Sequence, residues 1–142
     1  TELGLEQSIS TLAKAERARA ALYAQFNDLF SRYDLIVTPG ANTPAFDVEL
    51  RFPEAINGIK LEHYMAASTL TAAVTISASP ALSLPCGFDQ YGRPIGLQLI
   101  GRPRGEAALL AAGALFEVES GLAEQVPIDP RHGKVPPRGK LT

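Results

Sequence analysis

Apolar residues in the first quarter of the chain recur every three or four positions, which is the spacing of one helix face. The pattern predicts a long helix that ends near Arg32. A short strand with β-branched residues follows over residues 34–38, and Pro39 and Gly40 stop it. The helix residues expected to face a core are Leu5, Ile9, Leu12, Ala15, Ala18, Leu22, Phe26, Leu29 and Tyr33.

Two later apolar runs, residues 81–85 and 94–100, are short and bounded by proline and glycine, which favours strands over helices. Asp89 and Gly92 lie between them in an order that is typical of a turn. The two runs therefore predict a hairpin.

Two further helices are expected around this hairpin. Residues 61–73 are rich in small side chains, and residues 106–120 form an apolar pattern that Gly121 would end. Residues 39–60 carry scattered proline and glycine and predict a long irregular loop. Together the elements predict an α/β fold. The last helix should turn Leu109, Leu110, Gly113 and Phe116 inward.

Residues 65–86 contain no charged residue and are long enough to cross a bilayer. However, they carry seven hydroxyl side chains and two prolines, which are unfavourable in a membrane span. A buried helix that leads into a buried strand explains the segment better, so we expect no membrane association.

Composition places the 142 residues in one globular domain with 46% hydrophobic residues. We expect this domain over residues 1–125, followed by an extended or disordered proline-containing tail over residues 126–142. The net charge of −2 gives no reason to expect nucleic acid as a partner. A single cysteine, Cys86, and the absence of a visible secretory leader fit a cytoplasmic protein.

Candidate catalytic and metal-binding groups are few. Cys86, His63 and His132 could form a thiol–imidazole pair only if the fold brought them together, and their spacing is not that of metal ligands. Residues 101–106 are basic and contain glycine, but they lack the lysine and hydroxyl residue that end a phosphate-binding loop. We therefore expect no metal and no cofactor.

The segment over residues 79–103 closely resembles the C-terminal hairpin of the amidase signature family, serine hydrolases that cleave carboxamides. Ten positions match in order and without gaps. They are Pro80, Ala81, Ser83, Pro85, Gly87, Gly92, Pro94, Gly96, Gln98 and Gly101.

The resemblance implies a fold and a mechanism. Family members use a serine nucleophile, a second serine and a lysine base, all in the N-terminal half. In this sequence no two serines adjoin, and no such segment can be assembled. We therefore expect the C-terminal part of an amidase fold, with a mixed sheet completed by a missing N-terminal part. The chain alone should be inactive and should self-associate.

The same resemblance places the helix over residues 61–73 beside the acyl side of a small-molecule amide substrate. Met65, Ser68 and Ala72 would share one helix face, and we expect them either to bind substrate or to pack in a core. Within residues 39–60, the side chains that could lie at the rim of the substrate cavity are Arg51, Phe52, Glu54 and Asn57.

Two other functions remain open. The chain could be a non-catalytic binding or interaction module that retains the amidase scaffold. It could also be the A subunit of a tRNA-dependent amidotransferase, acting with partner chains. Relatives of that kind carry an acidic residue where this chain has Ser68, which argues against the second alternative. Thr75 and Ala78 also replace the asparagine and glycine of many family members.

Overall fold

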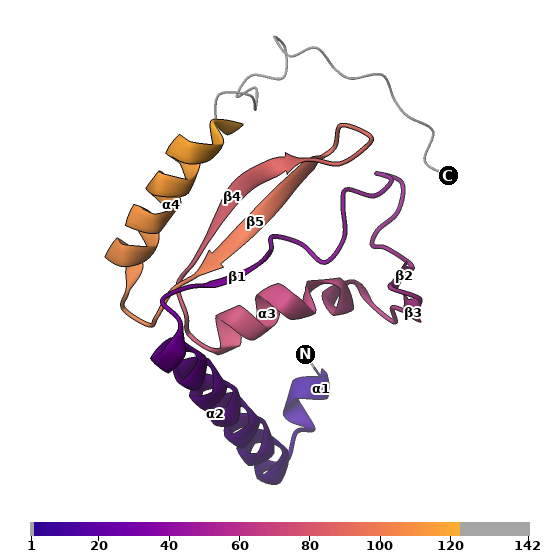
Figure 1. The fold of residues 1–142 in the computed structure, drawn as a ribbon. Helices are drawn as coiled ribbons and strands as arrows, with labels where there is room; N and C mark the ends of the chain where they lie inside the picture. The colour runs from indigo at the N-terminus through magenta and orange to yellow at the C-terminus, as the bar shows by residue number, and fades with distance from the viewer. Residues whose placement is uncertain (1, 123–142) are drawn as a thin grey trace.

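The structure is a computed structural model that describes residues 2–122, apart from the side chains of residues 2 and 3. The predicted tail over residues 126–142 lies outside the described residues, so the domain boundary stays a prediction. A sheet stands at the centre, with helices against it (Figure 1). In chain order the elements are α1 (Glu2–Leu5), α2 (Ile9–Arg32), β1 (Ile36–Pro39), β2 (Ala55–Ile56), β3 (Ile59–Lys60), the 3-10 helix η1 (Tyr64–Ser68), α3 (Thr69–Ile76), β4 (Ala81–Phe88), β5 (Pro94–Ile100) and α4 (Glu106–Ser120).

The main sheet has three strands in the order β1-β5-β4, and both pairings are antiparallel. Ile100 on the central strand is paired with Ile36 on one side and with Ala81 on the other. The α/β class and the hairpin are thus confirmed. Parallel pairing, which a mixed sheet also needs, stays a prediction about residues outside this sequence.

One face of the sheet is covered by α4. Leu84 and Leu99 from the strands and Leu109 from the helix are buried together. Gly113 allows close contact, because a Cβ atom there would overlap the Leu82 side chain. The expectation that Leu110 faces inward was wrong, because its side chain is 59% exposed.

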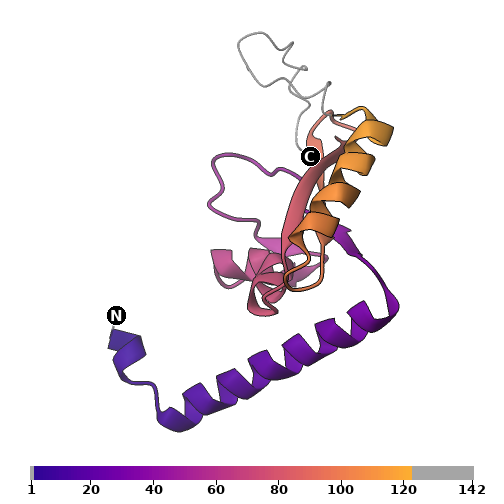
Figure 2. The same cartoon turned by 90° about the vertical axis from the view of Figure 1, so that its left-hand side faces the viewer.

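The other face of the sheet packs against α3 and the C-terminal end of α2, where Phe30, Val74 and Ile100 are buried. The remainder of α2 projects away from the sheet, and its N-terminal end lies near the short α1 (Figure 2). The prediction of a fully core-facing helix was therefore wrong over its first half and at its end: Leu5 and Ile9 are almost fully exposed, and Leu12, Ala15, Ala18 and Tyr33 are exposed as well. Leu22, Phe26 and Leu29 are half-buried. The helix begins at Ile9 because the Ser8 hydroxyl accepts the Thr11 N–H at 3.1 Å.

The helix predicted over residues 61–73 is displaced toward the C-terminus. In this segment, residues 64–68 form the 3-10 helix η1, and the α-helix α3 begins only at Thr69. Within the described chain, no helix is both long enough and apolar enough to cross a membrane.

Candidate substrate cavity

A cavity of about 670 Å³ opens beside the sheet, between the loop that follows β1, the region where η1 meets α3, and the start of β5. Its volume is in the usual range for small-molecule sites. The residues that line it are Pro39, Gly40, Ala41, Asn42, Thr43, Pro44, Ala45, Phe46, Arg51, Phe52, Pro53, Tyr64, Ala67, Ser68, Thr71, Pro94, Ile95 and Gly96.

The loop over residues 40–53, which we call the cavity loop, starts in tight contact with β5. The Gly40 N–H donates to the Gly96 carbonyl at 2.8 Å. A Cβ atom on Gly40 would lie 3.1 Å from the Gly96 backbone, closer than most side chains tolerate. This close approach brings the cavity loop directly over the start of β5.

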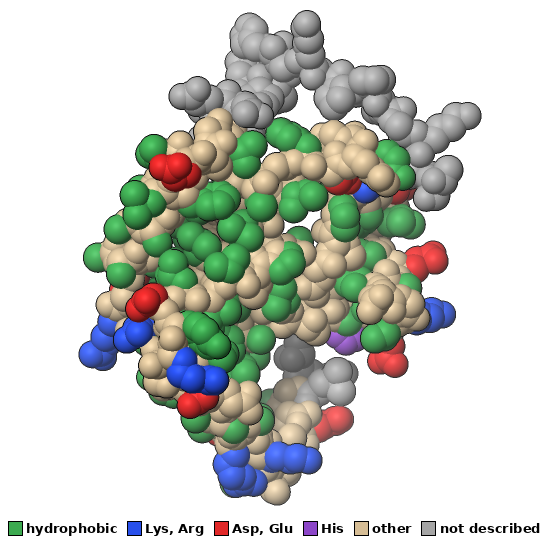
Figure 3. Space-filling view, viewed as in Figure 1, with side chains coloured by type: hydrophobic (Ala, Val, Ile, Leu, Met, Phe, Trp, Pro, Cys, Tyr) green, Lys and Arg blue, Asp and Glu red, His purple; other side chains and the backbone are tan. Residues whose placement is uncertain are grey.

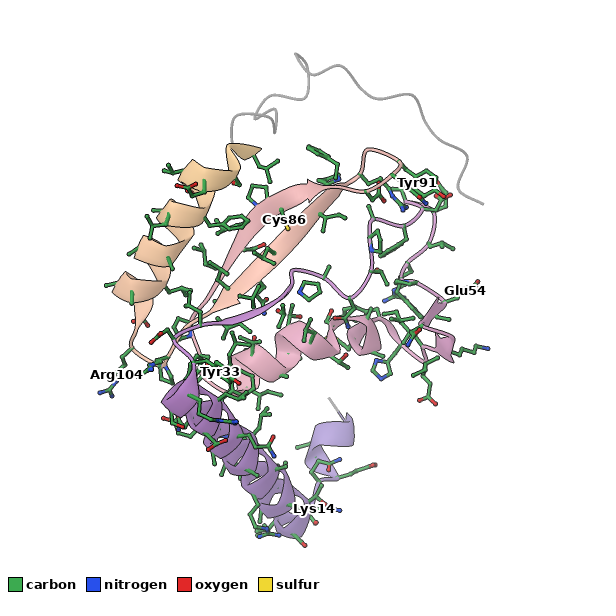
Figure 4. All side chains as sticks on the ribbon, in the orientation of Figure 1. Lys14, Tyr33, Glu54, Cys86, Tyr91 and Arg104 are labelled. Atoms are coloured by element: carbon green, nitrogen blue, oxygen red, sulfur yellow. The ribbon has the colours of Figure 1, made fainter. Side chains whose placement is uncertain are left out.

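Two side chains attach the cavity loop to other elements. The Asn42 amide donates to the Thr69 hydroxyl at 3.3 Å, which links the loop to the start of α3. The Arg93 guanidinium donates to the Ala45 carbonyl at 2.6 Å, which links it to the hairpin. Figure 4 shows Tyr91, at the hairpin tip, beside this loop.

Charge is scarce in the cavity. Among the described residues, Arg51 is the only charged one that lines it, and no carboxylate does. The polar contribution comes from Asn42, Thr43, Ser68 and Thr71, while most other lining side chains are apolar. Thr71 is already engaged, because its hydroxyl donates to the Ser68 carbonyl at 3.0 Å. Such a surface can contact an apolar molecule through its apolar side chains and an anionic group through Arg51.

The three predicted site residues do not all meet at this cavity. Ser68 lines it, whereas Met65 and Ala72 do not. The expected common face assumed one α-helix from residue 61, whereas residues 64–68 form the 3-10 helix η1 and the α-helix α3 begins at Thr69. The neighbours that do line the cavity are Tyr64, Ala67 and Thr71. Substrate binding by Ser68 stays a proposal.

The rim residues divide in a similar way. Arg51 and Phe52 line the cavity, whereas Glu54 and Asn57 do not and belong to the segment that forms the β2–β3 hairpin. Sequence reasoning missed Asn42 and Phe46, which lie in a segment without periodicity. The proline and glycine residues of that segment were the only signal that it bends back over the sheet.

Cys86 lies away from the cavity lining, exposed on β4 where the pairing with β5 shifts register (Figure 4). Among residues 2–122, no group of three or more His, Cys, Asp or Glu side chains could hold a metal ion.

The described chain is an α/β domain with a cavity beside its sheet, and comparison with known proteins identifies its family. The model of the Amidase family matches residues 3–110. The chain belongs to the amidase signature family.

Curated relatives agree with this assignment. The A subunit of glutamyl-tRNA(Gln) amidotransferase from Moorella thermoacetica is 44% identical over 104 residues, covering 73% of this chain and 20% of the relative. Its counterpart from Thermodesulfovibrio yellowstonii is 36% identical with the same coverage. The chain thus spans about a fifth of the length of these relatives.

Among solved structures, a bacterial aryl acylamidase of the amidase signature family shares the fold. Its TM-score is 0.75 at 24% identity, over 87% of this chain and 26% of that one. A second structure, described as a vestigial protein complex that reveals the evolutionary origins of an s-triazine catabolic enzyme, has a TM-score of 0.71 at 28% identity. The match covers 83% of this chain and 26% of the other.

Proposed function

We propose that this chain is the C-terminal part of an amidase that hydrolyses carboxamide C–N bonds, and that it supplies one wall of the substrate cavity. The observation that supports this most is a 670 Å³, mainly apolar cavity in a chain of the amidase family. The nucleophile and base would come from residues outside this sequence. A cytoplasmic location stays a prediction.

The reaction implied by the family proceeds in two stages. A serine hydroxyl attacks the amide carbon and loses its proton to a base, and the leaving nitrogen departs with a proton as ammonia or an amine. Water then attacks the acyl-enzyme, releases the carboxylic acid and restores the serine. In this scheme the described residues bind the substrate and exclude water; they do not form or break bonds.

The lining residues favour a particular substrate class. Phe46, Phe52 and Tyr64 offer apolar contact, and Arg51 adds a positive charge that no lining carboxylate of the described chain offsets. An ammonium group on the substrate would find no anionic partner on this wall. The proposed substrates are therefore neutral or anionic amides with an apolar or aromatic portion.

A second candidate is the A subunit of a tRNA-dependent amidotransferase, because the named curated relatives carry that description. Ser68, which replaces the acidic residue expected in glutamine-using members, weighs against it. Glutamine hydrolysis by the protein from the complete reading frame, together with its partner chains, would favour this candidate over a small-amide hydrolase.

The first test is an assay of the isolated chain on aryl amides and primary carboxamides. We expect no turnover above background, because neither the sequence nor the described cavity wall supplies a nucleophile and base. Turnover that Cys86→Ala abolishes would contradict the proposal and identify the thiol as nucleophile. The protein from the complete reading frame should hydrolyse amides, and its failure to do so would favour the non-catalytic module.

The second test introduces a carboxylate at the cavity wall with Ser68→Asp in that complete protein. An apolar amide should lose roughly 1–3 kcal/mol of transition-state binding because it must approach a buried charge. An amide with an ammonium group should be spared, because it gains a partner of comparable strength. Steady-state kcat/KM for the two substrates measures the split. Equal losses would place Ser68 in the structural core instead.

A further inference from the structure

The side chain of Arg93 joins two segments that lie 48 residues apart in the sequence. Its Nη1 donates to the Ala45 carbonyl at 2.6 Å, and its Nε donates to the Asp89 carboxylate at 2.5 Å. The side chain is 26% exposed, so solvent covers only part of it. One end of this arginine is therefore fixed to the hairpin and the other to the cavity loop.

Asp89 is itself held in place by the turn. One carboxylate oxygen accepts the backbone N–H groups of Tyr91 and Arg93, each at 2.9 Å, and the other accepts from the guanidinium. The turn also closes through two backbone bonds, Asp89 N–H to the Arg93 carbonyl and Gly92 N–H to the Asp89 carbonyl. The carboxylate therefore directs the guanidinium, with the Tyr91 ring centroid 5.0 Å from its central carbon.

Beyond the bonds of Gly40 and Asn42 at its start, the cavity loop has few hydrogen bonds to other segments of the described chain. Its local bonds, from the N–H groups of Glu49 and Leu50 to Asp47, stay within the loop. In the described chain, residues 43–53 make no hydrogen bond to another segment except the one from Arg93. This segment nevertheless carries several of the lining residues, including Phe46, Arg51 and Phe52.

We propose that Arg93 is a positioning residue that holds the cavity loop against the hairpin and thereby sets the shape of the substrate cavity. Its effect on substrate binding rests on the proposed function, whereas its effect on the loop does not. Arginine suits this role because its planar guanidinium presents separate N–H groups to two acceptors at once, which the single ammonium of lysine does less well.

The chain offers a matched control. Arg32 on α2 also pairs with an aspartate four residues earlier, Asp28, at 2.8 Å, and lies 5.7 Å from the ring of an adjacent tyrosine, Tyr33. The described hydrogen bond of the Arg32 side chain stays within α2 and does not reach the cavity loop. Arg32→Ala therefore removes the same chemistry without removing the link.

Limited trypsin digestion tests the proposal on the 142-residue chain. The bond after Arg51 lies in the cavity loop, and the bond after Arg93 is resistant because proline follows, so replacing Arg93 removes no cleavage site. Arg93→Ala should speed cleavage after Arg51 about five- to tenfold relative to cleavage after Lys14, if loop opening limits the rate. Arg93→Lys should give a smaller increase, and Arg32→Ala none.

An unchanged rate after Arg51 in Arg93→Ala, with an unchanged thermal transition, would overturn the proposal. If Arg93→Ala fails to fold, Asp89→Asn serves instead, because Asn keeps an oxygen for the backbone N–H groups but loses the charge. An unchanged rate after Arg51 in that variant would overturn the proposal too.

A kinetic readout separates this proposal from the proposed function. In the protein from the complete reading frame, Arg93→Ala should raise KM about three- to tenfold and change kcat less than about twofold, because a looser wall weakens binding without altering the reacting groups. Arg93→Lys should recover part of the loss. A fall in kcat of about three- to tenfold at unchanged KM would overturn the positioning role. Absence of any activity would count against the proposed function, while the digestion result would still decide the role of Arg93.

Discussion

Helix α2 and the β4–β5 hairpin differ in how much of their apolar surface the described chain covers. The 24-residue α2 buries only Phe30, near its C-terminal end. In β5, by contrast, Gln98, Leu99 and Ile100 are buried in succession, because α4 covers one face of the sheet and α2 and α3 cover the other. Burial thus depends on partners, and the described chain covers α2 at one end only.

The surface shows the same contrast. In Figure 3, hydrophobic side chains gather over the sheet between α4 and the cavity loop, and charged side chains lie mostly toward the edges and on α2. Exposed apolar residues also lie on α4, at Leu110, Leu115 and Val118. Large exposed apolar areas are uncommon on monomeric proteins and mark surfaces that bind other chains.

The largest expected effect comes from comparing two leucine truncations, one in the β4–β5 hairpin and one on α2. Leu99→Ala should lower the free energy of unfolding by about 2–4 kcal/mol, because Leu99 is 5% exposed and contacts the α4 interface. Leu12→Ala, at a position 56% exposed, should change it by less than about 0.5 kcal/mol. Urea unfolding of both variants measures the difference, and similar losses would show that α2 is covered in solution.

The next prediction concerns whether another copy of the chain covers α2 in solution. We expect the isolated chain to self-associate through its exposed apolar surface and open strand edges. If α2 takes part, Ile9→Lys should weaken association about ten- to hundredfold, because one aliphatic side chain contributes roughly 1.5–3 kcal/mol when buried.

Sedimentation across a range of concentrations measures this association. The control is Gln25→Lys, which adds a lysine on the exposed surface of the same helix, away from its apolar stripe. A stable monomer with a cooperative thermal transition would contradict the prediction and favour a self-sufficient binding module.

The elements that sequence patterns predicted best are those whose partners lie close by in the chain. The bounds of β5 and α4 were predicted to the residue, whereas β4 was predicted over residues 81–85 and extends to Phe88. Gly121 adopts the left-handed conformation, with a φ of 60°, that ends α4. The β2–β3 pair was missed, although Asn57 and Gly58 both have positive φ and an Asn-Gly pair is typical of a two-residue hairpin turn.

The candidate site was less predictable because its shape depends on distant contacts. Ser68 was identified only through the family resemblance, and of the three residues expected on one helix face it alone lines the cavity. The path of the cavity loop follows from the Gly40–Gly96 contact and from the Arg93 bond to Ala45. No local pattern in residues 40–53 encodes either contact.

The smallest expected effect compares the two aspartate–arginine pairs. Asp89 has a side chain only 11% exposed, whereas that of Asp28 on α2 is 70% exposed. Partial burial acts to raise the pKa of Asp89. However, hydrogen bonds from the Arg93 backbone, the Arg93 side chain and the Tyr91 N–H, together with the charge of Arg93, outweigh it, so this pKa lies below its usual value.

A lowered pKa in the folded state stabilises the protein at pH values above the unfolded pKa of about 3.9, and this contribution is lost as the pH falls through the folded value. The stability difference between the wild type and Asp89→Asn should therefore be constant near neutral pH and shrink below about pH 4. Asp28→Asn should change stability by less than about 0.5 kcal/mol throughout, because its ion pair is exposed. Thermal unfolding between about pH 7 and pH 2.5 measures both. A difference for Asp89→Asn that did not vary with pH would show that its carboxylate charge contributes nothing to the hairpin.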